Sequence, residues 1–325
     1  MVRNDPDTDF IFKPNVRYYN AGLKALLFSN DLGLPDAPIP EGDRTGRRVL
    51  VLGDSMTWGA YTGDINKGFP RLLEERMRRG GSGPRVETRV INAGIPGYGT
   101  KQEVSLYRKL AARLRANVVV LSFFVGNDFV DNLGWTDHVV IDDHLVNRRH
   151  SSMMTPLLIK LYEHSHIYRF LDSRIDAVSF TRGRGQPYTQ GMRFTFSRDE
   201  RPAFEDSLVE TARHLDRLIE TTRTYEARLI VILLPARLQI EEQARQEWIR
   251  RLKGDPPQFD LEKPNRAMAR LLEQRQAQLV WRDLLPVFRR EASTGASLFL
   301  PRDDHYSVQG NEVVAAEIEN LLRGL

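Results

Sequence analysis

Ser55 is the residue of this chain best placed to act as a nucleophile. It follows the apolar run 48–52 and the Gly53-Asp54 pair that ends that run. A continuous apolar run bounded by glycine is typical of a strand that is buried in a parallel sheet. Ligands of such sheets bind just beyond the carboxyl ends of the strands. The sequence therefore predicts that the Ser55 hydroxyl lies where a substrate would bind.

His305 could supply the base that a serine nucleophile requires, because a hydroxyl is a weak nucleophile until its proton is taken. It lies in a loop just before the predicted helix 309–322. A carboxylate on the other ring nitrogen would fix the tautomer of the imidazole and stabilise the imidazolium. Asp303 and Asp304 directly precede the histidine, and either could be this acid.

Two further residues could stabilise the negative charge that develops on a carbonyl oxygen under attack. Asn127 follows the apolar run 117–124, and Gly97 lies in the loop after the run 86–92. The Asn127 amide and the backbone N–H groups of Ser55 and Gly97 are the expected donors to that oxygen. Glycine at position 97 permits a close backbone approach or a positive φ. Because the carboxyl ends of parallel strands share one edge, these groups can converge.

Strands that alternate with helices predict an α/β fold with a doubly wound parallel sheet and helices on both faces. We expect strands at 48–52, 86–92, 117–124, 228–234 and 278–283, and helices at 68–79, 101–114, 203–226, 241–251, 262–275 and 309–322. We interpret residues 1–46, which are rich in Pro and Asp, as an extension packed on a single domain at 47–325. The sheet pattern breaks at 131–202, which we interpret as an insertion near the active site.

The composition narrows the classes of protein that the chain could be. Of its 325 residues, 41% are hydrophobic and 28% are charged, which is typical of a packed globular protein. The absence of cysteine excludes disulfides, thiolate metal sites and a cysteine nucleophile. A second histidine near 303–305, or a spaced set of carboxylates, is missing, so we expect no metal site.

Charge and hydropathy bear on partners and location. The net charge is +4, but the Arg-rich patches lack interleaved aromatic residues, so we expect no nucleic-acid partner. No run of 18 apolar residues predicts a transmembrane helix, and the amino terminus has no apolar segment of a signal peptide. Cytoplasmic and extracytoplasmic locations, the latter with a removed leader, both stay open, as does the oligomeric state.

Four short blocks, in order and context, resemble those of the SGNH hydrolases, also called GDSL esterases and lipases. They are Gly53-Asp54-Ser55, Asn92-Ala93-Gly94-Ile95-Pro96-Gly97, Gly126-Asn127-Asp128 and Asp303-Asp304-His305. The resemblance covers about residues 47–130 and 203–325. It implies a three-layer α/β/α flavodoxin-like fold with a mainly parallel five-stranded sheet and no cofactor. It also implies that Ser55 is the nucleophile, that His305 is the base, and that Ser55, Gly97 and Asn127 form the oxyanion hole.

One departure from the family pattern selects the acid. Many members place it three residues before the histidine, where this chain has Arg302. Other members, several of which act on bacterial exopolysaccharides, have an Asp-x-His arrangement, and this chain resembles them, which makes Asp303 the expected orienting acid. The resemblance implies a serine esterase that acts on a small-molecule or carbohydrate ester through an acyl-enzyme. An O-acetyltransferase or deacetylase acting on a polysaccharide, and a non-catalytic binding module on the same fold, are the alternatives.

Each block alone has an ordinary structural explanation, since Gly, Asp, Asn and Ser are common in turns and helix caps. Their joint order along the chain favours the catalytic interpretation. Trp58 and Tyr98 could line a substrate pocket or belong to the core. We expect Asp54 to hold the loop of the nucleophile and His214 to lie on a helix surface.

Overall fold

The structure is a computed structural model of the chain. It describes residues 2–20, 23–39, 46–79, 87–134, 138–141, 143–147, 155–165, 167–168, 187–198, 202–252, 258–301 and 303–325. Within these ranges, no helix combines the length and the apolar character that crossing a membrane requires.

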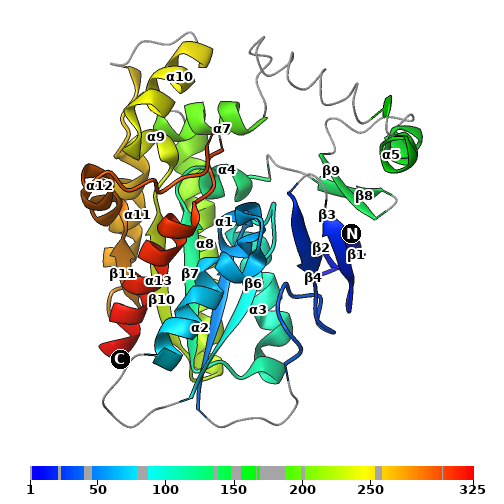
Figure 1. Cartoon of the computed structure of the whole chain (residues 1–325). Coiled ribbons are helices and arrows are strands. Elements are labelled where there is room, and N and C mark those ends of the chain that lie inside the picture. The colour runs from blue at the N-terminus through cyan, green and yellow to red at the C-terminus, as the bar shows by residue number, and fades with distance from the viewer. Residues whose placement is uncertain are drawn as a thin grey trace.

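The centre of the fold is a five-stranded parallel sheet (Figure 1). Its strands, in spatial order, are β11 (Val280–Asp283), β10 (Arg228–Leu234), β7 (Val118–Phe124), β5 (Arg47–Gly53) and β6 (Thr88–Gly94). All seven residues of β7 are buried, as expected for a central strand covered on both faces. In order along the chain the strands are arranged 2-1-3-4-5, which is the flavodoxin-like order. The predicted α/β fold class is confirmed.

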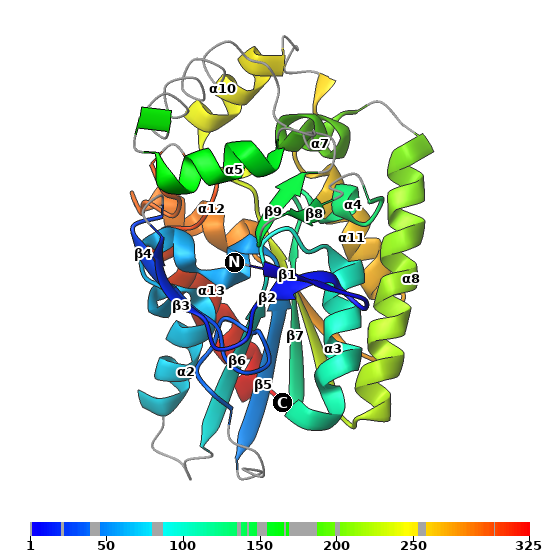
Figure 2. The same ribbon diagram turned by 90° about the vertical axis from the view of Figure 1, so that its right-hand side faces the viewer.

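Helices cover both faces of the sheet. On one face, α2 (Phe69–Arg79) packs against the carboxyl-terminal helix α13 (Val308–Arg323). On the other, α3 (Thr100–Leu114) lies beside the long helix α8 (Pro202–Thr224), which also contacts α11 (Lys263–Glu273) (Figure 2). The spacing of apolar residues explains which face of α13 is buried. Residues four positions apart form one buried stripe, which contains Val314, Ile318 and Leu322.

The predicted helices and strands agree with the observed ones to within a few residues, and the structure adds several short elements. The predicted helix 241–251 corresponds to α10 (Glu242–Leu252), and the additional helices are α9 (Arg237–Ile240), after β10, and α12 (Leu285–Ser293), after β11. Polar side chains dominate α10, whereas α12 buries Leu285, Val287 and Phe288. The first turn of α12 contains a proline, which is common at the start of a helix. The sequence at 285–293 thus contained a signal for this helix.

The amino-terminal segment forms two β-hairpins beside the main sheet, where we predicted no strands. They pair β1 (Val2–Asp5) with β2 (Asp9–Phe12) and β3 (Arg17–Asn20) with β4 (Ala25–Phe28). The Tyr98 hydroxyl donates to the Phe10 carbonyl, and Lys109 forms an ion pair with Asp5. The first hairpin is therefore attached to the loop after β6 and to α3.

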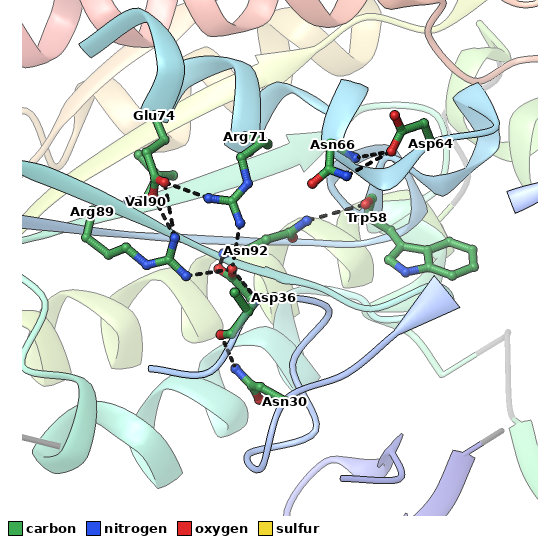
Figure 3. A network of polar contacts seen from close by, with 11 residues as sticks. Asn30, Asp36, Trp58, Asp64, Asn66, Arg71, Glu74, Arg89, Val90 and Asn92 are labelled. Carbon is green, nitrogen blue, oxygen red and sulfur yellow. Dashed lines mark hydrogen bonds and ion pairs between the residues drawn. The ribbon is translucent and has the colours of Figure 1, made fainter. Parts of the chain in front are cut away.

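A buried ionic network attaches the following segment to the sheet edge (Figure 3). The Asp36 carboxylate, only 2% exposed, accepts hydrogen bonds from Arg89 at 2.8 Å, Arg71 at 3.2 Å and the Asn92 backbone at 2.8 Å. The same two guanidinium groups bind Glu74 of α2. Residues up to 39 are thus tied to β6 close to the loop that carries Gly97.

Between residues 131 and 202 the structure describes β8 (His138–Ile141), β9 (His144–Asn147), α5 (Thr155–His164) and α7 (Pro187–Phe196). Whereas α7 contacts α4, α10 and α11, the hairpin of β8 and β9 lies against the first amino-terminal hairpin. The hairpin of β8 and β9 contacts β1 and β2, and the Val2 backbone N–H donates to the Asp143 carbonyl at 2.9 Å. These two segments, which lie far apart in the sequence, form one flank of the molecule (Figures 1 and 2).

Candidate active site

Ser55 begins the one-turn helix α1 (Ser55–Trp58), which follows β5 directly. Asp54 caps this helix, because its Oδ1 accepts a hydrogen bond from the Met56 backbone at 2.8 Å. The helix lies tightly on the end of β6: a Cβ at Gly94 would stand 2.5 Å from the Trp58 backbone nitrogen. Helix α1, and with it Ser55, can therefore occupy this position only because residue 94 is glycine.

A chain of two hydrogen bonds joins the predicted nucleophile, base and acid. His305 Nε2 lies 2.9 Å from Ser55 Oγ, and His305 Nδ1 lies 2.6 Å from Asp303 Oδ1. The same Asp303 oxygen accepts from the His305 backbone N–H at 2.8 Å. Of the two acids that precede the histidine, Asp303 is thus the one bonded to its ring. With the proton on Nδ1, Nε2 can accept the proton of the serine hydroxyl.

The loop of His305 is held by its neighbour Tyr306, which the fold buries almost completely. The Tyr306 hydroxyl donates to the Pro235 carbonyl at 2.9 Å, just after β10. Ser307 then caps α13, with its Oγ accepting from the Gly310 backbone at 3.1 Å. These contacts fix the imidazole at the carboxyl edge of the sheet although its loop is far from Ser55 in sequence.

Asp303 is an ionised partner for the imidazole. Burial alone would raise the pKa of this carboxyl, but the hydrogen bonds and charge of His305 outweigh burial, and Arg237 adds to them, so the pKa is lowered. Arg237 also donates to the Asp303 carbonyl at 3.1 Å. A carboxylate that stays charged can stabilise the imidazolium that forms when the serine proton is taken.

Asn127 lies at the start of the short helix α4 (Asp128–Asp131), beside Asp54. Its amide nitrogen donates to Asp131 Oδ2 at 2.7 Å and to Asp54 Oδ2 at 3.4 Å. The structure thus connects the asparagine to the residue that precedes Ser55. The amide oxygen is buried without a hydrogen-bond partner.

Gly97 has the positive φ that the sequence pattern allowed, at +83°. A Cβ here would lie 3.3 Å from the His138 ring and 3.5 Å from Leu145, both on the hairpin of β8 and β9. The hairpin of β8 and β9 therefore borders the loop of Gly97, next to the expected oxyanion hole.

A comparison with known families bears on the carboxyl-terminal part of the chain. The family model described as "SGNH hydrolase-like domain, acetyltransferase AlgX" matches residues 194–325. The matched segment includes Asp303 and His305, whose geometry with Ser55 is that of a catalytic triad. Residues 194–325 of the chain therefore resemble an SGNH hydrolase-like domain.

Solved structures similar to this chain are distant in sequence. The acetyl xylan esterase AlAXEase is 14% identical with a TM-score of 0.46, and the alignment covers 85% of this chain and 99% of that one. The lipase/acylhydrolase from Enterococcus faecalis is 16% identical with a TM-score of 0.45, covering 86% and 96%. The psychrotrophic esterase EstA from Pseudoalteromonas sp. is 12% identical with a TM-score of 0.44, covering 86% and 97%. No curated protein matches the chain significantly.

Tyr61 is a residue of the candidate site that the sequence did not reveal. It lies in a 3₁₀ turn at Ala60–Thr62, and its ring stacks on the His305 imidazole with centroids 3.5 Å apart. Burial raises its pKa to about 12, with the charges of Asp303 and Asp54 acting in the same direction. Its hydroxyl therefore stays protonated at neutral pH. No motif marked it, since its role depends on a ring contact across 244 positions of sequence.

Buried carboxyl groups lie behind the site. Glu103 and Asp128 are fully buried, and burial raises the pKa of each well above its ordinary value, as do the neighbouring acids Asp54 and Asp131. Burial raises the Asp54 pKa too, against the hydrogen bond from Met56 and the charge of His305. Glu103 and Asp128 are accordingly protonated at a pH where exposed carboxyls are charged.

Three expectations about other side chains can now be assessed. Tyr98 is fully buried and bonded to Phe10, so it belongs to the core. Trp58, 7% exposed, lies between Phe12 and Tyr61 and forms one wall of a small aromatic hollow with the amino-terminal hairpins.

The prediction that His214 lies on a helix surface is wrong: it is 4% exposed, and burial, followed by the charge of Arg217, lowers its pKa to about 4. Its face of α8 packs towards α3, which the local sequence could not reveal.

Among the residues that the structure describes, no cluster of three or more His, Asp or Glu side chains is arranged to hold a metal ion. Arg302, the residue that occupies the usual position of the acid, lies outside the described residues.

Proposed function

We propose that this protein is an SGNH hydrolase, a serine acyl-transfer enzyme that cleaves a carboxylic ester through an acyl-enzyme. The observation that carries the proposal is the continuous hydrogen-bonded chain from Ser55 through His305 to Asp303, at 2.9 Å and 2.6 Å. A serine, a base within hydrogen-bond reach and a group that orients the base are the elements of nucleophilic catalysis.

In the first half-reaction, Ser55 Oγ attacks the ester carbonyl carbon while its proton moves to His305 Nε2. The carbonyl π electrons move to oxygen, and the proposed donors to this oxyanion are the N–H groups of Ser55 and Gly97 and the Asn127 amide. When the tetrahedral intermediate collapses, the C–O bond to the alcohol breaks. His305 returns its proton to the departing alkoxide, which leaves as the alcohol.

In the second half-reaction, a water or hydroxyl group attacks the acyl-Ser55 ester. His305 takes the proton of this acceptor, and the intermediate collapses with return of that proton to Ser55 Oγ. With water the product is a carboxylic acid, and with an alcohol it is a new ester. The acceptor that reaches the acyl-enzyme therefore decides between hydrolysis and transfer.

The test is a substrate panel of acetylated sugars, short-chain esters and long-chain esters. We expect the wild type to hydrolyse at least one class and Ser55→Ala to lose this activity by at least about a thousandfold. Ser293→Ala is the matched control, because it removes a hydroxyl from an exposed end of α12. Equal ester hydrolysis by wild type and Ser55→Ala would refute the proposal.

O-acetyl transfer to a polysaccharide is the second candidate. Two observations favour it: the family matched over 194–325 is described as an acetyltransferase, and Asp303 precedes His305 in the Asp-x-His arrangement. The fold is the same for both reactions, so the distinction depends on the acceptor.

Acceptor dependence separates the two candidates. The protein would be incubated with an acetyl ester donor, with and without polysaccharide, and acetylation of the polymer measured by mass spectrometry. Transfer predicts a Ser55-dependent gain of acetyl groups on the polymer. Release of acetate at one rate with every polymer, and no acetylated polymer, would leave hydrolysis as the activity.

A further inference from the structure

Asp131 directly contacts the asparagine that the proposed mechanism uses. It stands four residues after Asn127 on α4, and its Oδ2 accepts from the Asn127 amide nitrogen at 2.7 Å. The second carboxylate on this nitrogen, Asp54, is at 3.4 Å, close to the upper limit of a hydrogen bond. An amide nitrogen has two hydrogens, and one of them is thus bound firmly and the other weakly.

The carboxylate is itself rigidly placed. Asp131 is only 6% exposed, and its backbone N–H donates to the Asn127 carbonyl at 2.9 Å, which closes the turn between them. A Cβ at Gly99 would lie 2.8 Å from the Asp131 Cβ, so the side chain is confined against the loop that precedes α3.

This arrangement selects one of the two orientations of the asparagine amide. In the opposite orientation, the amide oxygen would face the Asp131 carboxylate, and two acceptors would oppose each other. In the observed one, the amide oxygen has no partner, which costs free energy that the Asp131 contact must outweigh. Without Asp131, only the longer contact with Asp54 would favour this orientation of the amide.

We propose that Asp131 is a positioning residue that orients the Asn127 amide, so that its weakly bound hydrogen is available to the oxyanion. The inference rests on the proposed function for its catalytic consequence, because only a developing oxyanion needs that hydrogen. Asp131 contacts no reacting atom in this scheme and acts through Asn127.

The first test measures the rate at which a fluorophosphonate phosphonylates Ser55, since this reaction places developing negative charge on an oxygen in the same hole. We expect Asp131→Ala to slow labelling by about tenfold to a hundredfold, less than the loss of an entire donor. Asp131→Asn retains an acceptor oxygen and should recover most of the rate. If both variants label like the wild type, the inference is wrong.

A double-variant cycle separates positioning from a general structural effect. If Asp131 acts through Asn127, Asp131→Ala should change the labelling rate no further in an Asn127→Ala background. An equal loss in both backgrounds would overturn the proposal. Thermal unfolding of each variant checks folding, and Asp131→Asn serves where Asp131→Ala does not fold.

The second readout does not depend on activity. In protein labelled with ¹⁵N-asparagine, the signals of the Asn127 side-chain amide are assigned by their loss in Asn127→Ala. In Asp131→Ala, the two proton resonances of this amide should approach each other in chemical shift or broaden. Unchanged resonances would also overturn the inference. A wild type that labels with the probe but cleaves no ester would refute the proposed function while leaving the Asp131 effect measurable.

Discussion

The ring of Tyr61 lies face to face with the imidazole of His305, with centroids 3.5 Å apart and planes inclined by 8°. Trp58 in turn contacts Tyr61 in an edge-to-face arrangement, with the ring centroids 5.8 Å apart. The histidine is therefore held by a hydrogen bond at each ring nitrogen and by an aromatic face against its plane. An aromatic face also attracts the imidazolium that the proposed mechanism forms.

Replacement of Tyr61 should reveal the contribution of this stack. Tyr61→Ala removes the ring, and we expect kcat to fall by about five- to thirtyfold, the equivalent of a cation–π contact of about 1–2 kcal/mol. Tyr61→Phe keeps the ring and should stay within about threefold of the wild type. Steady-state hydrolysis of the preferred ester checks both. A Tyr61→Phe variant as slow as Tyr61→Ala would show that the hydroxyl, not the ring face, matters.

Asp303→Asn should impair the proposed base without changing the shape of the site. An amide can donate to His305 Nδ1 and so favour the wrong tautomer, and we expect kcat to fall by about a hundred- to ten-thousandfold. Asp304→Asn is the matched control and should retain most activity, because the ring contact comes from Asp303. The reverse ranking of the two variants would assign the orienting role to Asp304.

The sequence predicted much of this site because the relevant signals are local. Ser55, Gly97 and Asn127 each follow an apolar strand, and parallel strands bring their carboxyl ends to one edge. The strand order itself was available only through the family resemblance, since periodicity does not determine which strands are neighbours. The residues alone left Asp303 and Asp304 open, and the resemblance favoured Asp303, whose carboxylate is bonded to the His305 ring in the loop that Tyr306 holds.

What the sequence did not predict depends on contacts between distant segments. The four amino-terminal strands are only four residues each, too short for a period to stand out, and their hairpins are held by contacts such as that of Phe10 with Tyr98. Tyr61 and His214 carry no local signal of their surroundings. Asp131 likewise carries no local signal of its role, because this role depends on a contact between its side chain and that of Asn127.

The buried acid Glu103 should make folding stability depend on pH. Its folded-state pKa is raised above the ordinary value of 4.5 by burial and by the acids Asp54 and Asp131. The folded state therefore binds this proton more tightly than the unfolded state. The resulting stabilisation is complete below about pH 4.5 and is lost as the pH rises through the raised pKa.

Glu103→Gln removes this titration while keeping the side-chain shape. We expect the free energy of unfolding of the variant to exceed that of the wild type at high pH and to differ little from it at pH 4. Urea unfolding between pH 4 and pH 9 checks the slope. Glu75→Gln on exposed α2 is the matched control and should leave the pH profile unchanged, since its ion pair with Arg79 is at the surface. Parallel profiles for wild type and Glu103→Gln would contradict the expectation.

The Asp36 network should contribute strongly to stability although it lies outside the site (Figure 3). Asp36→Ala leaves Arg71 and Arg89 without this buried partner and removes an acceptor of the Asn92 backbone N–H. Removal of one partner of a buried ion pair costs about 3–5 kcal/mol. We expect a loss of that size in the urea unfolding free energy.

The exposed pair of Asp31 with Arg113 provides the control for this prediction. Both side chains are about 40% exposed, at 39% and 41%, so Asp31→Ala should cost less than about 1 kcal/mol. Because Asn92 also donates to the Trp58 carbonyl at 3.3 Å, next to α1, the Asp36→Ala variant should in addition slow the fluorophosphonate labelling of Ser55. Equal stability losses for Asp36→Ala and Asp31→Ala would show that the buried network does not attach the amino-terminal segment to the sheet.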